Sequence, residues 1–591
     1  MRGDGLGCGP NSNDTGPVVP GAGANPDGHV MMEGTGRVPS MAAPSSFDRS
    51  EALRRLGEER FDVLVVGGGI TGAGVALDAA SRGFRTALVE RHDFASGTSS
   101  KSSKLIHGGL RYLQQREFVL VYENLAERQV ALRNAPHLVR VLPFLVPLMT
   151  RDGLFNRKLA RAFGTALWMY DLTGGLRIGK RHSRISKEKA LVHMPTLRPD
   201  RLSGAYVYYD ARTDDARLTL ALCRSAAAHG AVVANYAGVT GVLKDDQGKV
   251  RGARIEADGE SIEVGADSVV NAAGVWADEV RRLDEGNDPD SLRPAKGIHI
   301  TVPWAKVRND MAAIIPVPKD KRSVFVVPWG DLTYVGTTDT DYDGPIDDAQ
   351  CAPEDIAYLL GALNATVTEP VTEADVVGTW AGLRPLLRDA TSERTADLSR
   401  RHAVGRSESG VVTVTGGKLT TYRKMADDTV DVVAAFLGKR RRRCRTKRLR
   451  LVGGEGFEPP AESLEPSTHS HLAGRYGTEA DAVQELIEAD PALGEPLVPG
   501  LPYLRAEAVF AVRHEMARTL DDVLARRTRA RLLARDASAR VADDVARLVG
   551  AELGWSDAER TREVEDYRAA VKAERAAADL PETAFDASFG A

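Results

Sequence analysis

The sequence is poor in cysteine and contains no long apolar run. Its four cysteines, Cys8, Cys223, Cys351 and Cys444, lie far apart among 591 residues. Because no Cys-x-x-Cys pair occurs, neither a zinc site nor a redox-active dithiol is indicated, and we expect no bound metal. Such sparse cysteine usage favours a reducing cytoplasm. No stretch of about 20 apolar residues occurs, so no membrane-spanning helix is expected.

The chain also lacks an excess of charge of either sign. Its formal net charge is −4, from 78 Lys and Arg against 82 Asp and Glu. This balance gives no reason to expect nucleic acid as a partner, so any anion binding must be local. The length exceeds what one hydrophobic core usually supports, and two or more domains are therefore expected.

The first 48 residues have little that could build a core. The first 40 contain 10 Gly and 5 Pro, and they show no charged-then-apolar signal pattern. We expect residues 1–48 to be a disordered extension. A later translation start, at Met31, Met32 or Met41, would explain this composition equally well.

Residues 61–90 predict a strand–helix–strand unit. FDVLVVGGG (61–69) is a buried strand that ends in glycines, ITGAGVALDAASRG (70–83) is typical of a helix, and FRTALVE (84–90) is a second strand. Helical and strand patterns continue beyond it, with a helix expected over 117–133 and a strand followed by a helix over 205–230.

The first turn of this unit carries a dinucleotide-binding fingerprint. Gly67, Gly69 and Gly72 are spaced as GxGxxG, and Ile70 and Thr71 begin the helix whose N-terminus would face a pyrophosphate. Glu90 ends the second strand, where a carboxylate accepts hydrogen bonds from ribose hydroxyls. The fingerprint alone does not separate NAD from FAD.

Two later glycine turns favour FAD. NAAGVWA (271–277) and VTGGKLTTYR (414–423) each follow an apolar strand. Taken singly, each is more often an ordinary strand-to-helix turn. In this order along the chain they suit a long cofactor lying across one sheet, with the last helix pointing its positive end at the flavin pyrimidine.

The segment TSSKSSKLIHGGLRYL (98–113) follows the ribose-binding strand. Ser102, Ser103 and Lys104 are suitable phosphate donors, and the glycines after His107 let the backbone pass close to a flat ring. A serine-rich surface loop is the plainer interpretation of these residues taken alone.

Three other stretches shape the expected organisation. VLPFLVPLM (141–149) is apolar but broken by two prolines, and we expect a buried loop there, with contact to lipid as the alternative. Residues 231–265 alternate as a strand meander, and 295–342 are strand-rich. KRRRRCRTKRLR (439–450) contains nine Lys or Arg in twelve residues and is consistent with a solvated linker or with a contact to anionic lipid.

Several long motifs identify a family. The sequence resembles the FAD-dependent, quinone-linked glycerol-3-phosphate dehydrogenases of aerobic bacteria and mitochondria over roughly residues 60 to 530. The motifs that carry this resemblance are GGGITGAG, SSKLIHGGLRYL, GTTDTDYDG (336–344), WAGLRPLLRD (380–389), TGGKLTTYRK and VPGLPYLRAEAVFAVRHEMARTLDDVLARRTR (498–529). The Gly/Pro-rich N-terminus and the basic tract depart from the family.

The resemblance implies an α/β fold in several parts. We expect an FAD-binding, Rossmann-like domain of the two-dinucleotide-binding (DAO) type, an interleaved β-rich substrate domain and a C-terminal helical domain. The expected divisions are an oxidoreductase domain at 49–437, with FAD-binding pieces near 60–130, 200–280 and 376–437 and substrate pieces near 131–199 and 281–375, then a basic linker at 438–454 and helices at 455–591.

The resemblance also implies the chemistry. The substrate would be sn-glycerol 3-phosphate, oxidised to dihydroxyacetone phosphate by hydride transfer to flavin N5, with a membrane quinone as acceptor. Catalytic candidates are His107, His299 and Arg384. Substrate-binding candidates are Arg111, Tyr112, Arg384, Lys418 and Thr421. Cofactor-binding candidates are Gly67, Gly69, Ile70, Thr71, Gly72, Glu90, Ser102, Ser103, Lys104, His107, Gly108, Gly109, Ala273, Gly274, Gly417, Lys418, Leu419 and Thr420.

Several alternatives stay open at this point. The general base is His107 or His299, since an arginine stays protonated. An oxidase that uses oxygen, an amine or amino-acid oxidase of the same fold, and a flavin-holding assembly module are the competing functions. A cytoplasmic protein peripheral to the inner face of the membrane is the expected location, and a homodimer is left open.

Overall fold

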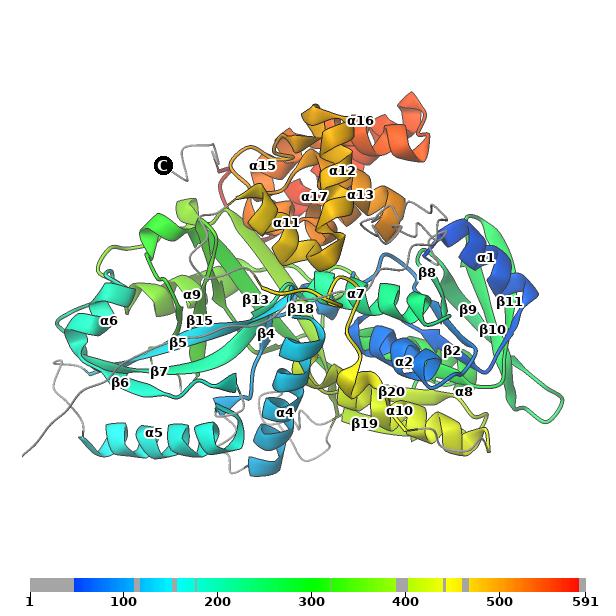
Figure 1. The fold of residues 1–591 in the computed structure, drawn as a ribbon, viewed down its shortest axis with the longest axis horizontal. Helices are drawn as coiled ribbons and strands as arrows, with labels where there is room; N and C mark the ends of the chain where they lie inside the picture. Colours follow the sequence, from blue (N-terminus) through cyan, green and yellow to red (C-terminus); the bar gives the residue numbers. More distant parts are fainter. Residues whose placement is uncertain are drawn as a thin grey trace, which may run out of the picture. The chain divides into compact units, whose positions relative to one another are not determined.

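The computed structural model describes residues 47–110, 117–150, 157–175, 178–318, 320, 322–388, 402–438, 443–459 and 467–583. The predicted N-terminal extension lies outside these ranges except for its last two residues. Three sheets and a set of C-terminal helices make up the described chain (Figure 1).

A six-stranded sheet contains the predicted strand–helix–strand unit. Its spatial order is β19 (His402–Arg406), β20 (Val412–Gly416), β12 (Val269–Asn271), β2 (Val63–Val66), β3 (Thr86–Val89) and β8 (Val232–Ala234). All neighbouring strands are parallel except the β19–β20 pair. The carboxyl ends of β20, β12, β2 and β3 therefore meet at one edge.

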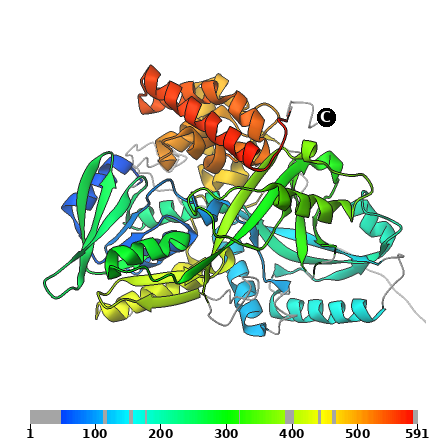
Figure 2. The ribbon, with the colours of Figure 1, turned by 180° about the vertical axis from the view of Figure 1, so that it is seen from behind.

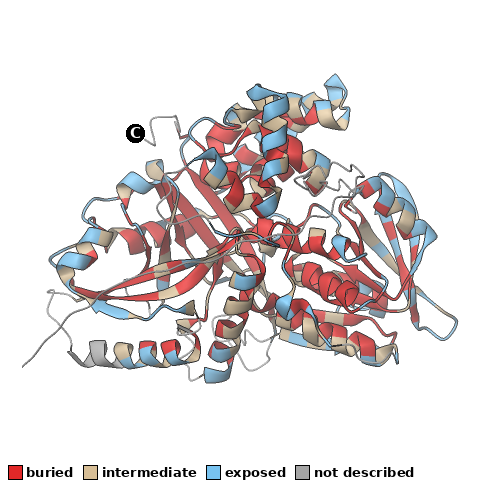
Figure 3. Ribbon diagram, viewed as in Figure 1, coloured by how far each residue is buried: buried red, intermediate tan, exposed pale blue. Residues whose placement is uncertain are grey.

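Both faces of this sheet are buried, which explains its nearly continuous apolar strands. Along β2, Val63 and Val65 pack among the helices α2 (Ile70–Ser81), α7 (Asp215–Ala228) and α10 (Tyr422–Phe436). Leu64 and Val66 point the other way, into a second core. The strand alternation thus predicts two layers around the sheet, and Figure 3 shows its strands buried.

The layer on the other face is a four-stranded sheet. Its order is β1 (Arg60–Phe61), β11 (Glu260–Ala266), β10 (Val250–Ala257) and β9 (Gly238–Lys244). Strands β9, β10 and β11 form the meander that the sequence predicts, and α1 (Arg49–Glu58) packs beside them.

A ten-stranded sheet forms the β-rich part. Its main order is β17 (Thr340–Asp341), β13 (Leu292–Pro303), β16 (Leu332–Gly336), β15 (Ser323–Trp329), β14 (Ala312–Pro316), β5 (Val139–Met149), β7 (Leu202–Thr213) and β4 (Leu105–Ile106), with β18 (Gly378–Leu387) on β13 and β6 (Ser183–Ile185) on β7. The helices beside these strands include α4 (Phe118–Asn134), α5 (Arg157–Tyr170), α6 (Lys187–His193) and α9 (Pro353–Asn364), whereas α8 (Ala277–Glu285) contacts β9 and β12 of the other two sheets.

The loop expected at 141–149 is wrong, because β5 runs straight through it. This strand pairs with β7 over nearly its whole length, including Pro143 opposite Tyr209 and Pro147 opposite Ala205. On its other side it meets β14 only at Phe144 and Leu145. Each proline lacks an N–H group, which a strand tolerates where no partner carbonyl needs it.

Two strands lie in a different sheet from the one their positions suggested. We expected 200–280 and 376–437 among the FAD-binding pieces, but β7 and β18 both belong to the ten-stranded sheet. Strand β7 leads into α7, and β19, in the six-stranded sheet, is the next described strand after β18. Two of the crossings between the parts therefore lie later in the chain than predicted, after β7 and after β18.

The C-terminal part is helical, as predicted. Its helices are α11 (Thr468–Tyr476), α12 (Ala480–Ala489), α13 (Arg505–Glu515), α14 (Ala530–Leu533), α15 (Arg535–Arg540), α16 (Ala542–Leu553) and α17 (Asp557–Ala577), with the π-helical turn η12 (Asp522–Arg527) before α14. Their core includes Leu332 of β16 and Val377, which directly precedes β18. Both views show the helices seated against it (Figures 1 and 2).

The second half of the basic tract is folded onto the protein. Residues 439–442 lie outside the described ranges. Beyond them, the amide of Asn134 donates to the carbonyl of Thr446 at 2.7 Å, and Leu451 N–H donates to Asn134 at 2.9 Å. The part of the tract that the structure describes therefore packs against the end of α4. Within the described ranges, every helix is too short or too polar to cross a bilayer.

Candidate active site

A large cavity opens at the carboxyl edge of the parallel sheet. Its volume is about 960 Å³, and the ten-stranded sheet forms its other wall. Val66, Val89, Ala272 and Gly416 mark the ends of four parallel strands on this wall. Ligands of open α/β sheets bind at such an edge.

The predicted glycine turn forms one end of the cavity. Gly67 has a φ of +109°, which a side chain would strain. A Cβ on Gly72 would lie 1.9 Å from the carbonyl oxygen of Gly67, so a glycine is needed here for the turn to pack against the helix. Gly72 does not line the cavity. Gly69, Ile70 and Thr71 do line the cavity, at the start of α2.

Glu90 lies on the wall beside this turn. Its carboxylate accepts the N–H of Gly68 at 2.6 Å and the N–H of His92 at 2.9 Å. Burial raises the pKa of Glu90, and these two N–H donors oppose the shift. A carboxylate has about four acceptor positions, so two remain for further donors such as ribose hydroxyls.

A second glycine turn, after β20, forms another part of the wall. Gly416 and Gly417 have φ values of +76° and +79°, and a Cβ on Gly417 would lie 2.4 Å from the sulfur of Met425. Lys418, Leu419 and Thr420 line the cavity as the chain enters η8 (Leu419–Thr421) and α10. Thr421 is buried behind them. Ala273 and Gly274, which follow β12, also lie on the wall.

The serine-rich loop divides between wall and interior. Ser102 and Ser103 line the cavity, but Lys104 does not. Its ammonium nitrogen lies 2.9 Å from Asp215, and the hydroxyl of Ser102 donates to the same carboxylate at 2.6 Å. A direct phosphate contact from Lys104 is therefore not part of our proposal below.

Both candidate histidines face the cavity. The ring of His299, in β13, stacks on Trp380 with centroids 4.7 Å apart, and its Nε2 lies 2.8 Å from the Ser103 hydroxyl. Its Nδ1 has no hydrogen-bond partner among the described residues. Burial holds the pKa of His299 well below its usual value, assisted by the positive charges of Lys104 and Arg384. The ring is therefore neutral near pH 7.

His107 lies on the same wall, between the loop and the second glycine turn. Its backbone N–H donates to the hydroxyl of Thr420 at 3.2 Å, and its ring meets the edge of Phe325 with centroids 6.1 Å apart. Gly109 lines the cavity. Gly108 does not, and a Cβ there would lie 2.4 Å from the hydroxyl of Tyr170.

Arg384 reaches the cavity from β18. Its guanidinium contacts Asp339 at 3.0 Å and the hydroxyl of Thr337 at 3.1 Å. A Cβ on Gly297 would lie 2.3 Å from the guanidinium, so this glycine makes room for Arg384 to cross the neighbouring strand. The side chain keeps 21% of its surface exposed.

Six charged wall residues were not predicted: Arg91, Lys101, Glu117, Glu279, Arg322 and Asp339. Asp339 lies in GTTDTDYDG, a motif that carried the family resemblance, so that motif held the signal. Arg322 precedes β15 with no local pattern to mark it. Arg111 and Tyr112, which were predicted, lie outside the described residues.

The wall suits a dinucleotide carrying a flat ring system. One end offers a glycine turn and a helix start, which favour a pyrophosphate, next to a carboxylate with acceptor positions left. The other end offers the start of η8 and α10, two histidines and a guanidinium. These donors and acceptors fit FAD along the cavity with a small anionic substrate beyond its ring.

Comparison with known protein families agrees with this arrangement. Residues 62–423 match the family described as FAD dependent oxidoreductase. Residues 444–560 match the family described as the C-terminal domain of alpha-glycerophosphate oxidase. Together the two matches account for the sheets around the cavity and for most of the C-terminal helices.

Individual relatives cover nearly the whole chain. It is 40% identical over 544 residues to glycerol-3-phosphate dehydrogenase 2 of Mycobacterium tuberculosis, covering 90% of this chain and 92% of the relative. It is 39% identical to the mitochondrial glycerol-3-phosphate dehydrogenase of Mus musculus over 85% of this chain and 72% of the relative. A crystal structure of the glycerol-3-phosphate dehydrogenase from Bacillus halodurans complexed with FAD superposes with a TM-score of 0.71 at 32% identity, covering 89% of this chain and 98% of that one.

Proposed function

The chain belongs to the FAD-dependent glycerol-3-phosphate dehydrogenase family, and on that premise we propose that it oxidises sn-glycerol 3-phosphate to dihydroxyacetone phosphate and passes the electrons to a membrane quinone. The chain is an FAD-dependent oxidoreductase of the DAO type. One observation supports the reaction most: a single cavity joins the dinucleotide-binding edge of the parallel sheet to two histidines and Arg384.

We assign the cofactor to the parallel-sheet side of the cavity. Glu90 would hold the ribose, and the start of α2 would hold the pyrophosphate. Ser102 and Ser103 would line the cofactor side of the cavity, although their hydroxyls already contact Asp215 and His299. The segment from Gly417 to Thr420 would lie at the flavin pyrimidine. FAD supplies the hydride acceptor at N5 when bound.

The substrate phosphate would lie near Arg384 and Lys418. A guanidinium can bind two phosphate oxygens at once, and Lys418 adds a point charge. Asp339 holds Arg384 in place and also offsets part of its charge. Arg111 and Tyr112 stay in the proposal from their motif, as further anion donors.

The chain's own task in the reaction is to take the proton from the C2 hydroxyl and to hold the substrate. His107 and His299 both line the cavity, which supports either one as the acceptor of that proton. Each is a side chain whose neutral form exists near neutral pH. Replacing the two histidines one at a time shows which of them is the general base.

An exposed apolar patch supports a membrane acceptor. Phe118 and Tyr122 on α4, Trp168 on α5 and Leu172 on η2 (Asp171–Gly175) are 45–66% exposed. We call these four residues the α4–α5 patch. The two helices lie near each other in both views (Figures 1 and 2), and α4 packs against η2. Large exposed apolar side chains in one region mark interaction surfaces.

The chemistry of this patch fits a lipid surface. Tryptophan and tyrosine favour the interface between headgroups and hydrocarbon. The guanidinium of Arg181 lies 4.0 Å from the Trp168 ring, and Lys180 is also exposed, so basic groups accompany the apolar ones. The cavity wall includes Leu120 of α4 and Phe163 of α5. A quinone in the membrane would thus approach the cavity from this side.

We therefore propose a peripheral position on the inner face of the cytoplasmic membrane. The competing acceptor is oxygen, because the family that matches the C-terminal part takes its name from an oxidase. The test is to supply glycerol 3-phosphate with a short-chain quinone in one reaction and with air alone in another. We expect the amount of dihydroxyacetone phosphate formed to equal the amount of quinone reduced. Stoichiometric hydrogen peroxide with no quinone reduction would make the protein an oxidase.

A further inference from the structure

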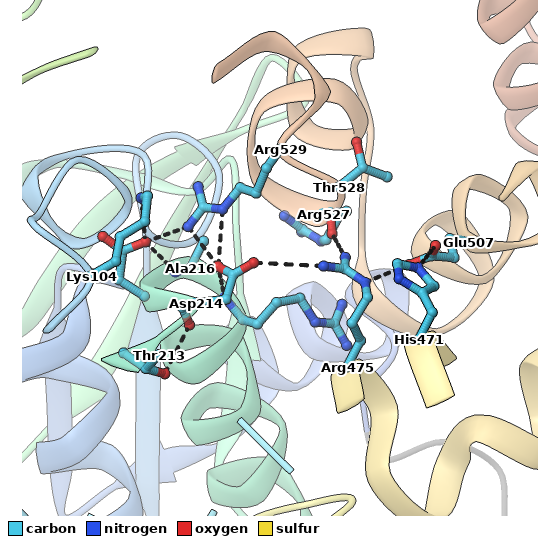
Figure 4. A network of polar contacts seen from close by, with 12 residues as sticks. Lys104, Thr213, Asp214, Ala216, His471, Arg475, Glu507, Arg527, Thr528 and Arg529 are labelled. Atoms are coloured by element: carbon cyan, nitrogen blue, oxygen red, sulfur yellow. Dashed lines mark hydrogen bonds and ion pairs between the residues drawn. The ribbon is translucent and has the colours of Figure 1, made fainter. Parts of the chain in front are cut away.

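A buried acidic pair joins the C-terminal helices to the cavity loop. Asp214 and Asp215 lie at the start of α7, and their side chains are 11% and 0% exposed. Arg529, which precedes α14, reaches both carboxylates from the helical part, and Lys104 approaches from the loop (Figure 4). Four charged groups thus meet where three distant segments of the chain converge.

Asp215 takes several donors from the loop. One carboxylate oxygen accepts the N–H of Ser102 at 3.0 Å and its hydroxyl at 2.6 Å. The other accepts the ammonium of Lys104 and the guanidinium of Arg529. Because Asp215, Lys104 and Arg529 are all buried, an uncompensated charge here would be costly. Asp215 therefore holds loop 98–104 only while Arg529 and Lys104 balance it.

The opposite side of the loop holds the cavity wall. The hydroxyl of Ser103 contacts Nε2 of His299 at 2.8 Å, and Tyr334 donates its hydroxyl to the carbonyl of Ser103 at 2.9 Å. The indole N–H of Trp380 donates to the carbonyl of Ser102 at 3.1 Å. Ser102 and Ser103 are thus hydrogen-bonded to Asp215 on one side of the loop and to His299 and Trp380 on the other.

We propose that Arg529 is a positioning residue for the reaction: through Asp215 it fixes Ser102 and Ser103, and through Ser103 it fixes the ring of His299 at the cavity wall. This inference rests on the proposed function for its kinetic part. It gives the C-terminal helices a role in the site, although no residue of theirs lines the cavity among the described residues.

The geometry at Arg529 requires an arginine. Its φ of +107° is rare for a residue with a side chain, and such strain persists only where the surroundings fix it. The guanidinium donates to Asp214 from two nitrogens, at 2.9 and 2.7 Å, while it also reaches Asp215. A lysine ammonium is a single point charge and cannot span both carboxylates in this way.

The electrostatics agree with a tight coupling. Burial and the nearby charge of Arg529 lower the pKa of Lys104 to about 8, against the pull of the two aspartates. The network continues through Arg475, which binds Glu507 at 2.6 Å, and Glu507 accepts from His471 at 2.7 Å. The loop is therefore tied to the interior of the helical part (Figure 4).

Arg531 offers a matched control two residues away. It is largely buried and it also binds two carboxylates, Asp521 at 2.7 Å and Glu574 at 2.9 Å. Both partners lie in the C-terminal helices. Arg529→Gln and Arg531→Gln thus each remove two ion pairs, but only the first removes a partner of Asp215.

The test uses the FAD-bound proteins and two readouts. The first is amide hydrogen exchange of a peptide covering residues 98–106. We expect it to speed up by about tenfold or more in Arg529→Gln, because local opening becomes easier, and to stay near wild type in Arg531→Gln. Equal exchange in all three proteins would overturn the proposal.

The second readout is anaerobic flavin reduction by glycerol 3-phosphate in single turnover. Misplacement of a reacting group by about 1 Å can cost roughly 100-fold, so the rate constant should fall about 10- to 100-fold in Arg529→Gln, with substrate Kd nearly constant. Ser103→Ala should slow reduction similarly, and the double variant should be no slower than the slower single one. Additive losses, or equal losses in Arg531→Gln, would overturn the proposal.

Two outcomes keep the inference separate from the proposed function. If the wild-type flavin is not reduced by glycerol 3-phosphate, the proposed function fails, and the exchange readout still decides the positioning. If the wild type is reduced and Arg529→Gln behaves identically, the positioning alone fails. Should Arg529→Gln not fold, Asp215→Asn gives the same comparison, because it keeps the side-chain shape and removes the charge that binds Arg529 and Lys104.

Discussion

The guanidinium of Arg384 lies 3.0 Å from the carboxylate of Asp339 on the wall of the cavity. The pair joins two strands that are neighbours of β13, because β18 carries Arg384 and Asp339 follows β16. An arginine held by the carboxylate of Asp339, with part of its side chain still exposed, is oriented in advance for a further anion. This arrangement favours the substrate phosphate as that anion.

Arg384→Ala should raise KM for glycerol 3-phosphate by about 10- to 100-fold, since a charged hydrogen bond contributes roughly 1.5–3 kcal/mol. The slow oxidation of glycerol, which has no phosphate, should not change. The KM of Arg384→Lys should lie between those of the wild type and Arg384→Ala, because lysine keeps the charge but cannot bind two phosphate oxygens at once. Steady-state kinetics with both substrates measure this, and an unchanged KM removes Arg384 from the phosphate site.

Glu90→Gln should weaken FAD binding by about tenfold, or roughly 1.4 kcal/mol. An amide keeps one acceptor oxygen but replaces the other with a donor, which opposes the N–H of Gly68 or His92. Fluorescence titration of the FAD-free protein measures the Kd. Glu117→Gln is the control, since Glu117 lines the cavity at the start of α4, away from the turn. Equal affinity in all proteins would contradict the ribose assignment.

His107→Asn and His299→Asn should differ in their effect on flavin reduction. Loss of the general base should lower the rate constant of flavin reduction by about 10²- to 10⁴-fold, and loss of a histidine that only lines the cavity should lower it less. Stopped-flow reduction of the two variants identifies the base. Losses below tenfold in both would show that neither histidine takes the proton.

The pH dependence gives an independent answer for His299. Its pKa is held well below 6.5 by burial, so its neutral, proton-accepting form persists as the pH falls through 6.5. If His299 is the base, the reduction rate constant should stay level from pH 8 to below 6 and fall only in more acidic buffer. A midpoint close to pH 6.5 would rule out His299 in this role.

Replacing the α4–α5 patch should separate quinone reduction from flavin reduction. Serine at Phe118, Tyr122, Trp168 and Leu172 removes the four exposed apolar side chains of the patch without touching the cavity wall. Activity with a soluble dye should persist, while vesicle binding and reduction of quinone in vesicles should fall together. Val192→Ser on α6, which is 74% exposed, is the control. Unchanged vesicle binding would contradict the membrane-facing assignment.

Acid should destabilise the fold through His137. This buried ring has its pKa lowered to about 3 by burial and by the charges of Arg217 and Arg140. Below about pH 6.5 the unfolded chain takes up a proton that the folded chain refuses, so stability falls toward pH 3 by about 1.4 kcal/mol per unit. Urea denaturation at several pH values should show a shallower slope for His137→Gln. Identical slopes would contradict this account.

The parallel core was predictable because its signals are local. Strands buried on both faces are continuously apolar, and the turn between β2 and α2 needs glycine at Gly67 and Gly72 for reasons that a short window contains. The same holds for the turn at Gly417. Strand β5 was missed because proline usually breaks a strand, and only its partner β7 shows that the missing N–H groups are tolerated.

The contacts that organise the site were not predictable in this way. Arg529 and Asp215 are 314 positions apart, and Arg384 and Asp339 are 45 apart. Lys104 looked like a phosphate donor from its neighbours in sequence, but a distant aspartate holds it in the interior. Pairing between remote charges leaves no local pattern, so the sequence predicts the residue types of the site better than their partners.

Anaerobic titration of the FAD-bound protein with sn-glycerol 3-phosphate tests the central claim most directly. The proposed function predicts that the flavin absorbance near 450 nm bleaches fully at saturating substrate, with one dihydroxyacetone phosphate formed per flavin, because the reaction transfers one hydride per turnover. Amino acids should leave the absorbance unchanged. Flavin that stays oxidised at saturating glycerol 3-phosphate, or that is bleached by an amino acid instead, would contradict it.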